Sequence, residues 1–304
     1  MKELKNKIIE FAKREGVNLI GFADRSRFAG VDPQHDPFAI FPEAKTVIMI
    51  GRRICRGSLR GVEEGTNFGD YALFGKNWLE DEFLALSAYN VTNFIEGFGW
   101  EAAPVFPNPA ELGPSGVSVG EGRPAPNVYP DFDYAAVACG LASLSYNRIV
   151  FTKEFGSRQR FHMILTDAEL ESTPLLDDPV CSGCRKCADA CPLNAISKTE
   201  TEEIEICGKI FTVGKIDYRL CNICQNGACV NRFSADASPD RIAALCNRTC
   251  MCGLEERGAL SNSFVNPFRT SEVWSIGGDK TADSSAEQAN VLGGVFSKSG
   301  NRGH

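Results

Sequence analysis

The sequence predicts an α+β protein in which a layered N-terminal domain of about residues 1–172 precedes a small cysteine-rich module. Helical and strand-like patterns alternate in the first part without a strict βαβ rhythm, which favours a layered domain. The composition then changes near residues 171–179, where the cysteines begin to cluster. We place the module at residues 173–257 and a C-terminal extension at 258–304. From Gly277 onward this extension is rich in Gly and Ser, so we expect a flexible tail there.

Hydrophobic spacing predicts the individual elements. Leu4, Ile8 and Phe11 fall on one face of an expected helix over residues 3–15. Further helices are expected over 79–97 and 134–141. The expected strands span residues 17–23, 46–50, 102–106 and 160–166. Residues 107–130 are rich in Pro and Gly, and such a long loop inside a compact domain is more often functional than idle. Residues 204–213 are expected to form a hairpin-like insertion in the module.

The most specific motif is a run of four cysteines with the spacing C-x2-C-x2-C-x3-C, followed by Pro192. Its members are Cys181, Cys184, Cys187 and Cys191. This is the ligand run of bacterial-type [4Fe–4S] ferredoxins, in which the fourth cysteine binds a second cluster. Zinc sites typically use two separated C-x2-C pairs, and disulfides need an oxidising compartment. The run therefore predicts iron–sulfur clusters and one-electron transfer.

A second cluster needs a second cysteine group, and the sequence contains one about thirty residues downstream in the module. By the exchange of ligands between the two runs, we assign one cluster to Cys181, Cys184, Cys187 and Cys229. We assign the other cluster to Cys191, Cys207, Cys221 and Cys224. The gap before Cys229 is one residue longer than usual, which weakens the assignment of Cys229 as a ligand.

Five cysteines are left over by this assignment, namely Cys55, Cys139, Cys246, Cys250 and Cys252. We interpret them as buried or free thiols, because free cysteine is often simply buried. Cys246 and Cys250 are four residues apart and could share one face of a helix. A further metal or redox pair is therefore the alternative for these two.

The composition and net charge of the chain argue against several classes of protein. The 304 residues carry a net charge of −7 and a pI of about 5.2, which argues against broad nucleic-acid affinity. No apolar run is long enough to cross a membrane, and no secretory leader opens the chain. Thirteen cysteines then indicate an anaerobic or well-reduced cytoplasm. Neither a Rossmann fingerprint nor a P-loop is present.

The order of these pieces resembles the family of epoxyqueuosine reductases and reductive dehalogenases. The resemblance covers about residues 1–275, and the combination of motifs is more specific than any one of them. The motifs that carry it are Cys181–Pro192, Leu220–Gln225, Ala135–Leu141, Phe155–Phe161 and Thr166–Asp167. The resemblance implies a nitroreductase-like, corrinoid-binding first domain joined to a two-cluster ferredoxin module.

The resemblance also implies a function. Two [4Fe–4S] clusters would pass electrons to a cobalamin between the domains, which would reduce a small organic substrate. A ferredoxin or flavodoxin would supply the electrons. The residues expected to bind the cofactor are Arg52, Arg53, Gly140, Leu141, Phe155 and Arg158. Among the tyrosines, Tyr146 has the best position for a proton donor.

The chain also departs from the family pattern. Ala142 and Ser145 stand where the family has glycines. No carboxylate occupies the position of the family's proton donor; Asp131 and Asp133 are offset from it, and we give them no role. The chain stops before the helical-repeat domain of the tRNA-acting members, so we expect a branch that does not act on tRNA.

Two other functions stay open. The protein could be an electron carrier or reductive activator without a corrinoid. It could also be a flavin-dependent reductase on the same fold. A carrier alone needs no domain of this size before its clusters, so catalysis is favoured.

Overall fold

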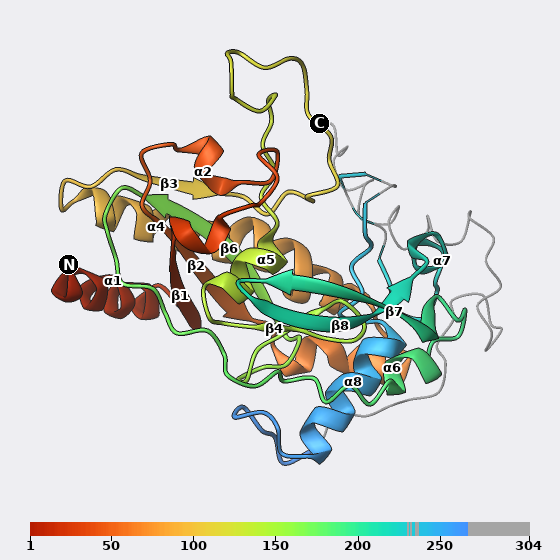
Figure 1. Ribbon diagram of the computed structural model, residues 1–304. Helices are drawn as coiled ribbons and strands as arrows, with labels where there is room; N and C mark the ends of the chain where they lie inside the picture. The colour runs from red at the N-terminus through yellow and green to blue at the C-terminus, as the bar shows by residue number, and fades with distance from the viewer. Residues whose placement is uncertain (230, 232, 235–236, 267–304) are drawn as a thin grey trace, which may run out of the picture.

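The computed structural model describes residues 1–229, 231, 233–234 and 237–266. A four-stranded sheet lies at the centre of the N-terminal part, with the strand order β1-β2-β6-β3 (Figure 1). Its strands are β1 (Leu19–Asp24), β2 (Thr46–Arg53), β3 (Ala102–Val105) and β6 (Gln159–Thr166). Every neighbouring pair in this sheet is antiparallel. The mixture of helices with an antiparallel sheet agrees with the predicted α+β class. Its nitroreductase-like character stays a prediction.

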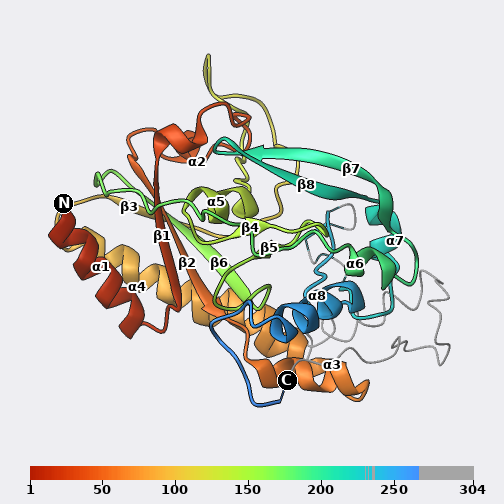
Figure 2. The ribbon, with the colours of Figure 1, turned by 60° about the horizontal axis from the view of Figure 1, so that its bottom comes forward.

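Helices cover both faces of this sheet. The helices α1 (Lys2–Arg14) and α4 (Ala85–Glu96) lie together on one face, and α5 (Phe132–Ala138) lies on the other (Figure 2). Side chains of β2 alternate between the two resulting cores, since Ile48 and Ile50 pack with α1 and α4 while Val47 and Met49 pack with α5. A strand buried on both faces explains the continuous apolar run that marked it in the sequence.

The long helical segment begins earlier than predicted. Two π-helical stretches, η3 (Tyr71–Asn77) and η4 (Leu79–Leu84), lead into α4. A side chain at Gly75 would come within 2.5 Å of the Tyr71 ring, so glycine allows this ring to lie against the backbone. Wide turns of this kind are rare and often occur near functional sites.

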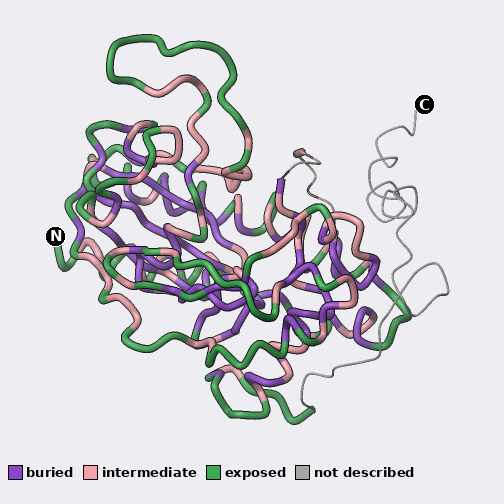
Figure 3. The backbone as a smooth tube through the Cα atoms, turned by 45° about the vertical axis from the view of Figure 1, so that its right-hand side comes forward, coloured by how far each residue is buried: buried purple, intermediate pink, exposed green. Residues whose placement is uncertain are grey.

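The remaining elements are short, apart from one hairpin and one helix. In the first part they are η1 (Arg25–Phe28), α2 (Pro37–Ile40), η2 (Arg56–Leu59), α3 (Arg60–Glu64), β4 (Ser143–Leu144) and β5 (Val150–Phe151). In the cysteine-rich part they are α6 (Lys186–Asp189), β7 (Ile196–Ile206), β8 (Lys209–Ile216), α7 (Tyr218–Asn222) and α8 (Leu245–Glu256). Residues 106–131, all of them described, contain no helix or strand, as predicted, and the loop extends outward (Figure 3).

The cysteine-rich part packs closely against the first part. The β7–β8 hairpin is longer than the predicted insertion, and its Phe211 and Val213 join the core under α5. The helix α8, which the sequence did not reveal, passes close to Gly156, where an added Cβ would lie 2.6 Å from the sulfur of Met251. The boundary at residue 172 stays a prediction. The predicted tail, from Gly277 onward, lies outside the described residues.

Within the described part of the chain, every helix is too short or too polar to span a lipid bilayer.

A buried ion pair joins the two parts. Arg160 of β6 donates a hydrogen bond to Asp240 over 2.6 Å, and the Tyr71 hydroxyl donates to the same carboxylate over 2.8 Å. Burial alone would raise the pKa of Asp240, but the charges of Arg160 and Lys76 more than offset this and lower it to about 2. The carboxylate is therefore ionised at any ordinary pH, and it fixes the segment that leads into α8.

We expect Asp240→Asn to destabilise the fold by about 3–5 kcal/mol, because it removes the nearer counter-charge of the buried Arg160 and leaves only Glu80, 3.7 Å away. Chemical denaturation at pH 7 measures this change. The same substitution at Asp217, whose carboxylate pairs with Arg219 at the surface, should have little effect. Equal losses in the two variants would contradict a special role for the buried pair.

Candidate functional site

The first set of thiols combines the loop before α6 with α8. Cys181, Cys184 and Cys187 come from the loop and the start of α6, and Cys250 comes from α8. A hydrogen bond from Cys250 lowers the pKa of the Cys187 thiol and raises that of Cys250, and the charge of Cys181 acts on Cys250 as well. Cys184 is exposed. This set opens to solvent on one side.

The second set of thiols is more deeply placed. Cys191, Cys221, Cys224 and Cys246 line one small cavity at the base of the cysteine-rich part. Burial raises the pKa of Cys221 to about 11 and that of Cys246 to about 12. Such thiols are protonated until a metal replaces the proton, as happens when a cluster binds.

Two predicted ligands make other contacts in the structure. Cys207 is at the turn between β7 and β8, where its thiol donates to the carbonyl oxygen of Arg27 over 3.2 Å. Cys229 pairs through its backbone with Asp240, and burial raises its pKa to about 12. The structure therefore gathers Cys246 and Cys250 with the other six cysteines of the predicted ligand sets. The spacing of these two cysteines on a helix was the signal that could have found them.

Within the described residues, no group of three or more Cys, His, Asp or Glu side chains is arranged to hold a metal ion. Thiols around a cluster contact separate iron atoms, so they need not converge on one point as the ligands of a zinc ion do.

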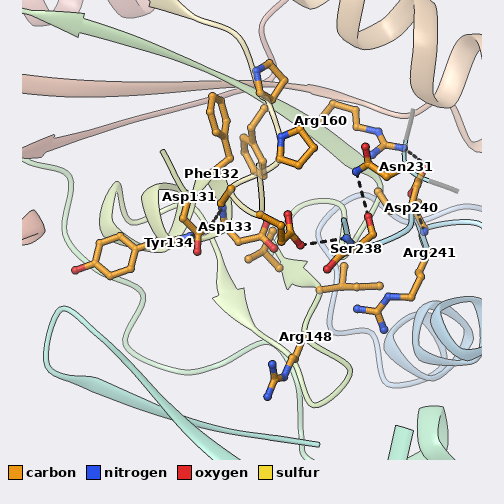
Figure 4. A pocket seen from close by; sticks show the side chains of 18 of the residues that line it. Asp131, Phe132, Asp133, Tyr134, Arg148, Arg160, Asn231, Ser238, Asp240 and Arg241 are labelled. Carbon is orange, nitrogen blue, oxygen red and sulfur yellow. Dashed lines mark hydrogen bonds and ion pairs between the residues drawn. The ribbon is translucent and has the colours of Figure 1, made fainter. Parts of the chain in front are cut away.

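A large cavity of about 680 Å³ lies between the first part and the cysteine-rich part (Figure 4). Its walls come from the loop at residues 107–111, the start of α5, strands β5 to β7 and the segment before α8. Charged side chains of both signs line it. The acidic ones are Glu80, Glu111, Asp131, Asp133 and Asp240, and the basic ones are Lys76, Arg148, Arg160 and Arg241. This volume is in the range of sites for small molecules and cofactors.

Two carboxylates of this cavity stand at the start of α5. Asp131 caps the helix by accepting hydrogen bonds from the backbone N–H groups of Asp133 and Tyr134, at 2.9 and 3.0 Å. The surrounding protein raises the pKa of Asp133, and the neighbouring Asp131 raises it further, to about 7, against the opposing effect of Arg241. Asp133, an exposed residue of the cavity wall, therefore holds its proton to a higher pH than an ordinary aspartate.

Arg241 belongs to the walls of both cavities. It lines the large cavity and also the small one that the second set of thiols surrounds. Its guanidinium lies 5.4 Å from the centre of the Tyr218 ring, and its charge acts on Cys246, Cys221 and Asp133. This residue is therefore the boundary between the thiols and the cavity.

The residues predicted to bind the cofactor are not brought together at this cavity. The Arg52 side chain bonds to the carbonyl oxygen of Glu15, and the Arg53 backbone N–H to the Asn18 side chain. An added Cβ at Gly140 would lie 2.2 Å from the carbonyl oxygen of Pro174. Leu141 packs against the core under α5.

The other three predicted residues are buried elsewhere. Phe155 packs in the core under α5, and the fully buried Arg158 donates to Asn262. The Tyr146 hydroxyl donates to the carbonyl of Ser197 over 3.0 Å, and its ring packs near the thiols. The roles given to these residues stay predictions, and none of them lines the large cavity. Asp133 and Arg241, to which we gave no role, do line it.

Known proteins match the cysteines and the fold. The family described as a 4Fe-4S binding domain matches residues 176–197, which supports a [4Fe–4S] cluster. Tetrachloroethene reductive dehalogenases of Desulfitobacterium hafniense and Dehalobacter restrictus are 26% identical over 200 residues, which cover 62% of this chain and 29% of theirs. The chain thus spans less than a third of the length of these relatives.

An epoxyqueuosine reductase from Bacillus subtilis has the same fold, with a TM-score of 0.51 and 18% identity over 88% of this chain and 68% of that one. These neighbours are of the two kinds that the sequence motifs indicated.

The raised pKa of Asp133 has a measurable consequence for stability. Between pH 3.8 and about 7 the folded protein keeps a proton on Asp133 that the unfolded chain releases. Ionisation of Asp133 therefore opposes folding more and more as the pH rises through this window. We expect Asp133→Asn, which cannot ionise, to gain stability relative to the parent protein between pH 4 and 7. Denaturation at several pH values measures this, and a difference that is independent of pH would contradict it.

Proposed function

We propose that this protein is a two-cluster iron–sulfur reductase that delivers electrons to the large cavity. The observation that carries the proposal is the position of Arg241, which lines both the large cavity and the small cavity surrounded by the second set of thiols. Electrons would enter at the exposed side near Cys184, pass to the second cluster and leave toward the cavity. The similarity to reductive dehalogenases and the fold of an epoxyqueuosine reductase support a reductase.

We propose one cluster on Cys181, Cys184, Cys187 and Cys250, and the other on Cys191, Cys221, Cys224 and Cys246. The exchange rule is kept, because Cys191 of the first run belongs to the second cluster. The fourth ligand of each cluster comes from α8 instead of from Cys207 or Cys229. The hydrogen bond between Cys187 and Cys250 and the small cavity shared by the second set support this assignment.

Iron content tests the ligand sets directly. After anaerobic reconstitution we expect about eight irons per chain, since each of the two clusters holds four. Cys246→Ala and Cys250→Ala should each lose up to half of this iron, whereas Cys207→Ala and Cys229→Ala should keep it. The last two are matched controls. Iron loss on replacing Cys207 or Cys229, without loss on replacing Cys246 or Cys250, would restore the assignment made from the sequence.

We further propose that the cavity accepts a cobalamin-type cofactor together with a small organic substrate. The cavity lies where the electrons would emerge, and its charged and polar lining can bond to the amide groups around a corrin. A bound corrinoid would supply the one-electron cobalt chemistry of the reduction. The chain's own residues would bind, orient and protonate the substrate.

Asp133 is the proton donor that we propose in place of Tyr146. A general acid works best when its pKa lies near the working pH, and that of Asp133 is about 7. Asp133 lines the cavity, whereas the Tyr146 hydroxyl donates to the backbone of the hairpin.

The expected partners follow from this scheme. A ferredoxin or flavodoxin would donate electrons near Cys184. The net charge of −7 favours a small molecule as substrate. That this chain does not act on nucleic acid stays a prediction. A location in the cytoplasm stays a prediction.

Cobalt binding distinguishes the corrinoid reductase from the two alternatives. We expect the anaerobically reconstituted protein to retain about one cobalt for its two clusters when cobalamin is added. Its absorption spectrum should be that of a base-off corrinoid. Flavin retained in place of cobalt would favour a flavin-dependent reductase. Full iron with neither cofactor would favour an electron carrier.

A further inference from the structure

Arg241 is buried without a full set of hydrogen-bond acceptors. Only 6% of the residue is exposed, and its Nη1 has no hydrogen-bond partner. Asp133 acts on its charge, but no hydrogen bond joins the two side chains. A buried charged donor without an acceptor is costly, so such a group is usually completed by a ligand or by water.

Arg148 brings a second guanidinium to the same cavity from a different element. It stands in the turn between β4 and β5 with a left-handed φ of 56°, and its backbone N–H donates to Ser145 over 2.9 Å. Its Nη2 pairs with Glu202 of β7, while its buried Nε has no partner. The side chain is only 21% exposed. A non-glycine residue in this conformation is uncommon and is often found at functional sites.

The other cations of the cavity differ from these two. Arg160 is held by Asp240, Tyr71 and the carbonyl of Gly75. The charge of Lys76 acts on Asp240 and Cys229. The cavity wall therefore holds two arginine side chains that lack a full set of acceptors, one on the thiol side and one beside the hairpin (Figure 4).

We propose that Arg241 and Arg148 form an oxyanion site, which binds the carboxylate or phosphate of a small organic acid in the cavity. Arginine suits this role because its planar donors match the oxygens of both groups. The inference names the substrate class of the proposed reductase and rests on that function only in treating the cavity as its active site. An anion held at Arg241 would also lie beside the second cluster, where electrons would arrive.

A different role for Arg241 is to balance the charge of the thiolates. Its charge acts on Cys246 and Cys221 more strongly than on Asp133. In that case the residue would set the reduction potential of the second cluster, but it would not bind ligands. The two roles give opposite results when ligand binding is measured.

The test compares probes of one shape and different charge. Benzoate, phenyl phosphate and the neutral benzamide would be titrated calorimetrically into oxidised, cluster-loaded protein. We expect one of the two anions to bind at least about tenfold more tightly than benzamide, the factor for one charge-assisted hydrogen bond. A preference for benzoate would indicate a carboxylate ligand, and a preference for phenyl phosphate a phosphate ligand.

Three variants locate the site. Arg241→Gln and Arg148→Gln should each weaken the anion about tenfold and leave benzamide unchanged. Arg219→Gln is the matched control, because Arg219 is exposed and pairs with Asp217. Iron analysis of the same samples shows whether the clusters, and with them the proposed function, are intact.

Each outcome decides the proposal. Equal binding of anions and benzamide, or no saturable binding of any probe, would overturn it. Anion binding that survives in Arg241→Gln would overturn it as well, and a changed cluster potential in that variant would then assign Arg241 to charge balance. Anion binding in a protein that retains no cobalt would keep the oxyanion site while removing the corrinoid function.

Discussion

The buried pair of Arg160 and Asp240 is the contact on which the arrangement of this protein depends. Arg160 belongs to the central sheet, and Asp240 lies in the segment that leads to α8. The 2.6 Å contact and the Tyr71 hydroxyl fix the start of that segment against the sheet. Because Arg241 follows directly, its position in the cavity wall is fixed as well. A surface ion pair could not do this, since water would compete for both charges.

The segment after this pair leads into α8, whose cysteines Cys246 and Cys250 join the two thiol sets. The sequence run provides three thiols for one site and a fourth for the other, which leaves each site incomplete. The helix α8 then places Cys250 beside Cys187 and Cys246 beside Cys191 and Cys221. The docking of α8 on the first part, at Gly156, is therefore part of building both thiol sets.

Much of this organisation could be predicted from the sequence. The cysteine run, the strands of the central sheet and the long loop were visible because each depends on local spacing. The positions of Cys246 and Cys250 on α8 were not, because they depend on contacts such as Arg160–Asp240 between residues 80 positions apart. Cys207 was assigned by the exchange of ligands between the two runs, although it lies inside the predicted hairpin-like insertion.

The residues that line the large cavity could not be predicted from local spacing either. Gly140 was predicted to bind the cofactor from its motif, and in the structure it lies against the backbone of Pro174 and does not line the cavity. Asp133 and Arg241 lie about 110 positions apart in the sequence, and only the fold brings their charges together. The residue types alone indicate one acidic and one basic side chain, but they do not predict that the two side chains lie near each other.

The spacing of Cys246 and Cys250 has a consequence for the speed of electron flow. Residues four apart on a helix are separated by about 6 Å along its axis, a distance that the backbone hydrogen bonds keep constant. With one proposed ligand of each cluster on this rigid helix, the distance between the two clusters would hardly change when the surrounding loops fluctuate. Tunnelling between them would then be insensitive to those fluctuations.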